Sequence, residues 1–253
     1  MEQKEPGRRQ VATTNSVFSI VETLQERNGA GVSEVAEAVD LAPSTVHKHL
    51  NTLVEREYVV KDGTEYRLGL RFLKHGRSVH NNSPLVPVAQ DPIEQLAESV
   101  GEFVWVFAEE HGWGVHILKA EGEHGVQTHG KVGKRSHLHY LAAGKAMLAY
   151  MAEDRRNRIL DRHGLSAKTE QTITDRDELE AEFETIRERG FAFNEEETVS
   201  GLRAVGAPIV DECVVGAVCI CGPANRMRGE RFREELPEKL LGTTNEIELK
   251  LSY

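Results

Sequence analysis

A break between two short amphipathic segments constrains this fold more than any other feature of the sequence. The segment GVSEVAEAVD (residues 31–40) is followed by LAPSTVHKHLNTL (residues 41–53), which opens with the four-residue break LAPS. In the second segment, Val46, Leu50 and Leu53 are spaced by four and then three residues, which predicts one face of a helix. Two such helices joined by a tight turn are typical of a helix-turn-helix.

The opposite face of the predicted helix is polar and carries one fixed cation. Small donors and acceptors of this kind suit a helix that lies in the major groove of DNA and contacts base edges and phosphates. The alternative is an ordinary solvated helix face, which this segment alone does not distinguish from a DNA-reading face. Ser44 is also expected to cap the helix, with Pro43 just outside it. The polar residues of this face are Ser44, Thr45, His47, Lys48, Asn51 and Thr52.

The flanking segments complete the pattern of a winged helix-turn-helix. Residues 13–29 have helical periodicity and end in Asn-Gly, a common helix terminus. Residues 55–69 change to strand periodicity around KDGT, a hairpin turn that would form the wing. Lys61 and Thr64 at its tip are placed to reach a phosphate or the minor groove. The alternative is a plain helical domain whose hairpin has no role in binding.

A helical connector and a linker follow the wing. Residues 68–79 return to helical spacing, and HNNSPLVPVAQDP (residues 80–92) is rich in proline and asparagine, which indicates a domain boundary. Asp91 is expected to cap the first helix of the second domain, with Pro92 as its first residue. The predicted division is a DNA-binding domain at 9–71, a linker helix and linker at 72–90, and a second domain at 91–253.

The second domain alternates strand-like and helical segments, which predicts an α+β fold with helices packed on one sheet. Residues 102–110 and 112–120 predict an antiparallel pair, and a third strand is expected at 125–133. A helix is expected over residues 140–164. The segment CVVGAVCICGP (residues 213–223) is nearly all apolar, so we expect it to be a central strand.

The net charge of −10 argues against a uniformly basic nucleic-acid-binding chain, but the charge is unevenly distributed. Residues 1–75 are nearly neutral, and a DNA-binding module needs only local positive charge. No apolar run has the length of a membrane span, and the first residues do not resemble a secretory signal. Three cysteines suit reduced thiols, so we expect a cytoplasmic protein without a membrane partner.

Signals for catalysis are poor. The sequence lacks the G-x-S-x-G, P-loop and H-E-x-x-H motifs, so we expect no enzyme activity and no cofactor. Cys219 and Cys221 alternate on one predicted strand and therefore share a face, and with His137 and His139 they could bind zinc. Buried cysteines on a central strand are more often packing residues, so the expectation is that no metal is bound.

Several segments together resemble the IclR-type transcription regulators over nearly the whole chain. In the first domain they are SIVETL, GVSEVAEAVDLAPSTVHKHLNTLVE and YRLGLRFL. In the second they are VQTHGKVGKRSHLHYLAAGKAMLAYM, TITDRDELEAEFETIRERGFAFNEEETVSGLRAVGAPI and GPANRMRGERF. The resemblance implies a winged helix-turn-helix joined by a linker helix to a GAF-like effector-binding domain. It also implies a homodimer or a dimer of dimers that binds palindromic promoter DNA under the control of a small metabolite.

The resemblance also implies a recognition helix from Ser44 to Leu53 and an effector pocket, with some departures from the family pattern. Cys219 and Cys221 stand where relatives often carry serines. Asn194 stands where some relatives carry an acid, and Glu57 where a glycine is expected before the wing strand. Because thiols donate hydrogen bonds weakly, a carboxylate ligand would be held differently here. The implied pocket residues are Leu138, Leu141, Ala143, Gly144, Asn194, Leu202, Ala204, Cys219 and Cys221.

The leading prediction is a ligand-responsive DNA-binding transcription regulator that senses a small organic acid, a sugar acid or a sugar in its second domain. The effector would change the placement of the two winged domains of a dimer on their half-sites. The alternative is a regulator with the same DNA-binding module that senses a metal or thiol oxidation through Cys219 and Cys221.

Overall fold

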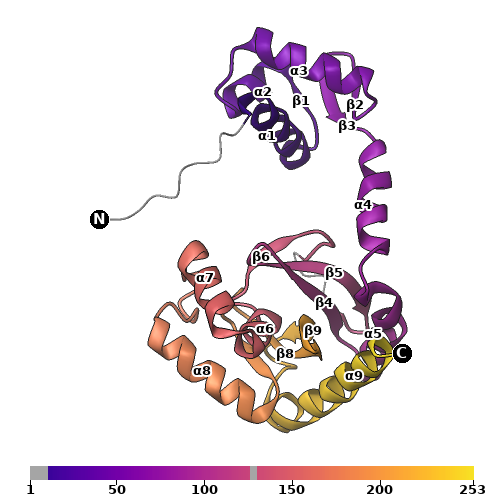
Figure 1. Ribbon diagram of the computed structural model, residues 1–253. Coiled ribbons are helices and arrows are strands. Elements are labelled where there is room, and N and C mark those ends of the chain that lie inside the picture. The colour runs from indigo at the N-terminus through magenta and orange to yellow at the C-terminus, as the bar shows by residue number, and fades with distance from the viewer. Residues whose placement is uncertain (1–10, 126–129) are drawn as a thin grey trace. The chain divides into compact units, whose positions relative to one another are not determined.

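The computed structural model of the chain describes residues 11–125 and 130–253. Its packing divides the chain into two compact units between Val79 and His80 (Figure 1). Each unit has a hydrophobic core of its own. The domain ranges predicted from the sequence also assign functional roles, which this division does not test. Those ranges therefore stay predictions. In the part of the chain that the structure describes, no helix is long and apolar enough to cross a bilayer.

The first unit is a helix-turn-helix with a small antiparallel sheet, in the order that the sequence predicted. Val46, Leu50 and Leu53 are buried against Ile20 and Leu24 of the first helix and their neighbours. The sheet has the order β1-β3-β2, and β2 and β3 form the wing hairpin. The elements are α1 (Ala12–Arg27), β1 (Ala30–Gly31), α2 (Val32–Ala38), α3 (Pro43–Glu55), β2 (Val59–Asp62), β3 (Glu65–Leu68) and α4 (Arg71–Asn81), which leads into the second unit.

The start of α3 corrects the predicted cap. Ala42 occupies the cap position, and Pro43 is inside the first turn of the helix. Ser44 is therefore a helical residue whose side chain makes no cap hydrogen bond. Proline suits the first helical position because its missing N–H would have no intrahelical partner there. Because Ser44 does not cap the helix, its hydroxyl stays on the polar face of α3.

The turn at the tip of the wing and the turn before its first strand have left-handed backbones. Asp62 pairs with Glu65, so the wing turn consists of Gly63, with a φ of 59°, and Thr64, as KDGT predicted. Glu57, just before β2, has a φ of 63°. Glycine adopts a left-handed conformation without steric cost, which gives a physical reason for the glycine that the family resemblance led us to expect at this position. The exposed Glu57 carboxylate lies 3.1 Å from Arg71 Nη1.

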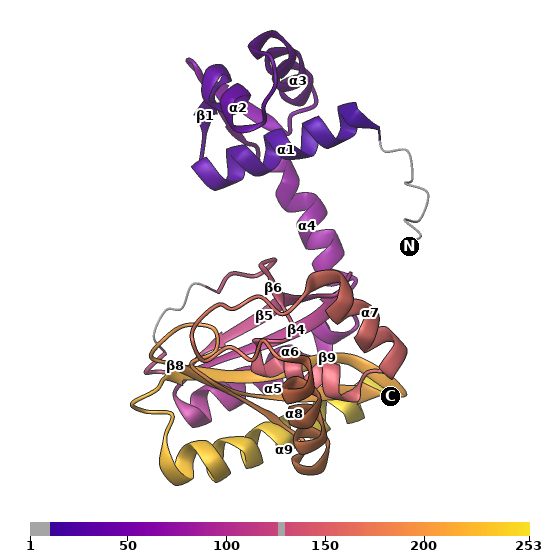
Figure 2. The ribbon, with the colours of Figure 1, turned by 90° about the vertical axis from the view of Figure 1, so that its left-hand side faces the viewer.

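The second unit is a six-stranded antiparallel sheet with helices on both faces, as Figure 2 shows. Its strand order is β6-β5-β4-β9-β8-β7, which confirms that β9 is central. The helices are α5 (Leu85–Val100), α6 (Ala142–Tyr150), α7 (Glu153–His163), α8 (Arg176–Arg189), the π-helical turn η1 (Arg231–Glu235) and α9 (Leu236–Leu251). The strands are β4 (Phe103–Glu110), β5 (Trp113–Glu121), β6 (Arg135–His137), β7 (Ala192–Glu195), β8 (Leu202–Asp211) and β9 (Cys213–Pro223).

Alternating side chains of this sheet supply two separate cores. Phe103 and Trp105 of β4 pack with α6, α7 and α8 on one face, whereas Val104 and Val106 pack with α5 and α9 on the other. This alternation follows from the period of two in a strand. The unit is thus a three-layer α+β structure, and the predicted fold class is confirmed.

Two predicted helix boundaries in the second unit are wrong. Helix α5 begins at Leu85, and Pro92 lies inside it, because the apolar face formed by Ala89 and Ile93 continues without a break. The helix expected over 140–164 is two helices, α6 and α7. Of the strand expected at 125–133, residues 126–129 lie outside the described residues, and the third strand on this edge is β6.

Replacement of Glu57 tests the left-handed backbone before the wing. Glu57→Gly and Glu57→Ala both remove the ion pair with Arg71, but only glycine relieves the steric strain at a φ of 63°. We expect Glu57→Gly to have a free energy of unfolding about 1 kcal/mol higher than Glu57→Ala. Chemical denaturation of the two variants measures the difference, and equal stabilities would contradict the assigned backbone conformation.

Candidate functional site

The polar face of α3 is exposed along its length. Its buried face fixes the helix in the first unit and turns the opposite side chains to solvent. Asn51 Nδ2 lies 3.4 Å from His47 Nδ1, and the Thr52 hydroxyl donates a hydrogen bond to the backbone oxygen of Lys48 at 3.1 Å. Lys48 has no ion-pair partner within residues 11–125 and 130–253. Of the six residues predicted on this face, Ser44, His47, Lys48, Asn51 and Thr52 are exposed and Thr45 is partly buried.

A groove of about 470 Å³ lies between α3, the wing and the start of α2, where Gly31, Val32, Ser33 and Glu34 line it. His47 lines it from the helix, and Lys61 and Thr64 line it from the wing. The Lys61 ammonium lies 5.5 Å from the ring centroid of Tyr66, which is buried in the core of the unit. The structure therefore brings predicted DNA-binding residues of the helix and of the wing together at one surface.

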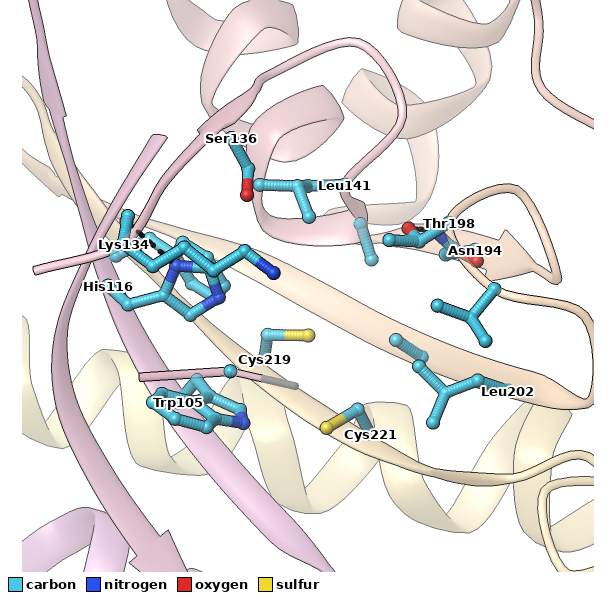
Figure 3. A pocket seen from close by; sticks show the side chains of 15 residues that line it. Trp105, His116, Lys134, Ser136, Leu141, Asn194, Thr198, Leu202, Cys219 and Cys221 are labelled. Atoms are coloured by element: carbon cyan, nitrogen blue, oxygen red, sulfur yellow. Dashed lines mark hydrogen bonds between the residues drawn. The ribbon is translucent and has the colours of Figure 1, made fainter. Parts of the chain in front are cut away.

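A second cavity, of about 90 Å³, lies between the sheet of the second unit and the start of α6 (Figure 3). Six residues expected in the effector pocket line it: Leu141, Asn194, Leu202, Ala204, Cys219 and Cys221. The other described residues that line it were not predicted: Trp105, Phe107, His116, Gly130, Lys134, Ser136, Ala142, Thr198 and Val199.

Three residues expected in the pocket are not among the described residues that line it: Leu138, Ala143 and Gly144. Gly144 and Leu138 pack directly on each other, since a Cβ at Gly144 would collide with the backbone of Leu138. Ala143 faces β8 in the same way, because a Cβ at Gly206 would collide with the backbone of Ala142 and Ala143. These three residues therefore hold α6 in place beside the cavity.

The electrostatics of the cavity favour an anion. The first residues of α6 have backbone N–H groups without intrahelical partners, and the helix dipole adds partial positive charge there. Lys134 adds positive charge to the lining, and no carboxylate is among the described residues that line the cavity. The aromatic rings of Trp105 and Phe107 form an apolar wall. This combination suits a small acid with an apolar part.

Asn194 holds the rim of the cavity together. Its side-chain nitrogen donates hydrogen bonds to the backbone oxygen of Tyr140 at 2.5 Å and to the Thr198 hydroxyl at 2.7 Å. Its side-chain oxygen accepts a hydrogen bond from the backbone N–H of Glu197 at 3.0 Å. An ionised acid could not donate to the carbonyl of Tyr140. The amide therefore has a structural role that an ionised acid at this position could not fill.

The two buried thiols are poorly suited to react. Burial raises the pKa of Cys221 to about 12, although a hydrogen bond from Trp105 opposes the shift. Burial also raises the pKa of Cys219 well above its usual value, and the neighbouring Cys221 adds to the effect. Because the thiolate is the nucleophile and the metal ligand, both groups are unreactive in this conformation at neutral pH.

The histidines of the metal hypothesis lie in another cluster. The His137 ring is 4.6 Å from Trp113 and 5.6 Å from His139, measured between ring centroids. In the described part of the chain, no group of three or more histidine, cysteine, aspartate or glutamate residues is placed to hold a metal ion. The geometry thus gives no support to a zinc site formed with Cys219 and Cys221.

The lysine of the GKAMLA segment is buried behind the pocket wall. Lys145 Nζ lies 2.6 Å from Glu197 Oε1, and both side chains are almost fully buried. Burial raises the pKa of Glu197, whereas the positive charge of Lys145 opposes this shift. The pair connects the second turn of α6 to the loop after β7, so this lysine is structural rather than part of a phosphate-binding loop.

Replacement of Gly206 tests the contact that positions α6. Gly206→Ala should lower the free energy of unfolding by about 2 kcal/mol, because the added methyl group collides with the backbone of α6. Gly242→Ala is the control, since a Cβ there meets nothing within 4 Å and alanine favours the interior of α9. Chemical denaturation of both variants should show opposite signs. A Gly206→Ala variant as stable as the parent would contradict the described contact.

Two family models together match most of the chain. The model of the IclR helix-turn-helix domain matches residues 17–63, and that of the bacterial transcriptional regulator IclR C-terminal domain matches residues 77–249. The chain is 28% identical over 249 residues to the probable HTH-type transcriptional regulator ArcR of Halobacterium salinarum. That match covers 96% of this chain and 95% of the relative.

Solved structures show the same architecture. The Thermotoga maritima IclR crystal structure has a TM-score of 0.80 at 31% identity, covering 95% of this chain and 99% of that one. An IclR homologue from Microbacterium hydrocarbonoxydans, crystallised with 4-hydroxybenzoate, shares the fold at 20% identity with a TM-score of 0.82 and covers 95% and 99%. The two family models match the two units seen in the structure, the winged helix-turn-helix and the sheet with its cavity. The chain belongs to the IclR family of transcriptional regulators.

Proposed function

We propose that this regulator reads operator DNA with the exposed face of α3 and contacts the adjoining backbone or minor groove with its wing. The observation that carries the proposal is the groove in which His47, Lys61 and Thr64 meet. Lys48 supplies a phosphate contact, and Asn51 is placed to read a base edge. Ser44, Thr45 and Thr52 complete the contact surface.

The regulator acts as a homodimer or a dimer of dimers. Symmetric dimers match palindromic half-sites one helical turn or a multiple apart. Phe18 on α1 and Leu70, Leu73 and Val79 on or beside α4 are more than half exposed, which leaves large apolar side chains for a partner subunit to cover.

Two substitutions on α3 separate phosphate contact from base reading. Lys48→Ala should weaken binding to specific and unrelated DNA alike and reduce the salt dependence of log K by about one unit of slope. Asn51→Ala should reduce discrimination between the operator and a mutated operator by about 2 kcal/mol. Lys250→Ala, which removes a lysine paired with Glu246 in the second unit, is the charge control.

Equilibrium binding to the DNA upstream of its own gene, at several salt concentrations, measures both effects. An Asn51→Ala variant with unchanged specificity would show that α3 does not read bases in the proposed way. A Lys250→Ala variant that loses as much affinity as Lys48→Ala would reduce the effect of Lys48 to net charge.

The effector is a small organic acid. The cavity of about 90 Å³ is smaller than the roughly 150 Å³ apolar cavity that accepts benzene in another protein, so a sugar ring would not fit without rearrangement. Lys134 and the start of α6 favour negative charge at the same place. The 4-hydroxybenzoate complex of the Microbacterium homologue is an example of this fold holding a small acid.

Filling the cavity tests the effector site. Ala204→Phe should abolish the rise in melting temperature that small carboxylic acids produce, because the ring occupies the ligand volume. Ala204→Ser is the matched control and should keep the response. Both variants should bind DNA without ligand as the parent does. A response that survives in Ala204→Phe would place the effector elsewhere.

A further inference from the structure

His116 is turned into the effector cavity by an irregularity of β5. Phe107 of β4 pairs with His116, but the preceding Val106 pairs with Leu118, so Ile117 is an extra residue in the ladder. Leu118 packs in the core on the α5 and α9 side of the sheet, whereas His116 lines the cavity on the opposite side. In a regular strand both side chains would share a face. The bulge thus directs the imidazole into the cavity.

The hydrogen bond on Nδ1 fixes the tautomer of this imidazole. His116 Nδ1 lies 3.0 Å from the backbone oxygen of Lys134. A carbonyl oxygen can only accept, so Nδ1 carries the hydrogen. Burial lowers the pKa of His116 to about 4, and the ring is therefore neutral at physiological pH. Its other nitrogen, Nε2, presents a lone pair.

The Nε2 lone pair can accept a hydrogen bond. The ring is buried against Trp105 and Phe107, with ring centroids 5.0 and 4.3 Å away, and Nε2 faces the cavity (Figure 3). No hydrogen-bond partner of Nε2 exists in the described parts of the chain. A carboxylate is ionised at neutral pH and has no hydrogen to give, whereas an alcohol has one. The thiols of Cys219 and Cys221 are weak donors.

We propose that the effector is a small hydroxy acid whose alcohol donates a hydrogen bond to His116 Nε2, while its carboxylate lies toward Lys134 and the start of α6. The proposal rests on the small-acid effector site proposed above and specifies its ligand. An oxo acid of the same size would bring a carbonyl oxygen against the lone pair of Nε2. Such an acid would lose one hydrogen bond and would place two acceptor atoms against each other.

Matched pairs of ligands test this selectivity on the full-length protein. Calorimetric titration at neutral pH with lactate and pyruvate, and with 2-hydroxybutyrate and 2-oxobutyrate, compares a hydroxy acid with its oxo counterpart. We expect the hydroxy acid of each pair to bind about tenfold more tightly. The ratio should stay constant from pH 6 to 8, because His116 titrates only near pH 4.

Variants then assign the preference to His116. His116→Phe keeps an aromatic ring between Trp105 and Phe107 but removes the acceptor, so the two ligands of a pair should bind within about twofold of each other. His116→Gln offers both a donor and an acceptor, so it should also lose most of the preference, and this variant covers the case in which the phenylalanine variant does not fold. His137→Phe replaces a histidine outside the cavity and should leave the ratio unchanged.

The outcomes distinguish this proposal from the function on which it rests. Equal binding of hydroxy and oxo acids by the parent protein would overturn the role of His116 and leave the small-acid effector site standing. A preference that persists in His116→Phe would assign the alcohol to another residue and also overturn it. Failure of all four acids to bind, with a response to a neutral compound instead, would overturn both.

Discussion

The contact between α6 and β8 at Gly206 is the constraint on which the rest of the second unit depends. Only a residue without a side chain lets the backbone of Ala142 and Ala143 lie directly on the sheet. This contact places the positive end of α6 over β9, where the backbone N–H of Ala143 meets the Cys219 thiol. Two residues further along the same helix, Lys145 meets Glu197 in a buried ion pair. The effector cavity is the space left beside this contact.

Local patterns in the sequence were sufficient for the DNA-binding unit. The spacing of Val46, Leu50 and Leu53 predicted α3, and KDGT predicted the wing turn, because periodicity and turn chemistry act over a few residues. The cap of α3 was misplaced because Pro43 and Ser44 are both common at a helix start. Helix α5 was started too late because Pro92 is tolerated inside a helix whose buried face continues past it.

The effector pocket was predicted only in part, because its other walls depend on pairing between strands. The residues that were found come from β7, β8, β9 and the start of α6, where resemblance to the family supplied the positions. Trp105 was missed, although it pairs with Cys219 across β4 and β9 and therefore shares its face. His116 could not have been placed by a period of two, since that period puts it on the same face as Leu118. A bulge is visible only once the partner strand is known.

The hydrogen bond that orients the His116 ring is accepted by the backbone oxygen of Lys134, not by its side chain. Substitution of Lys134 would change the charge of the cavity, but any residue at that position still offers a carbonyl oxygen to the imidazole. The charge of the accepted ligand and the polarity of its second functional group are therefore encoded separately. A single substitution at 134 would therefore lower the positive charge of the cavity, while the imidazole keeps its tautomer and its acceptor nitrogen.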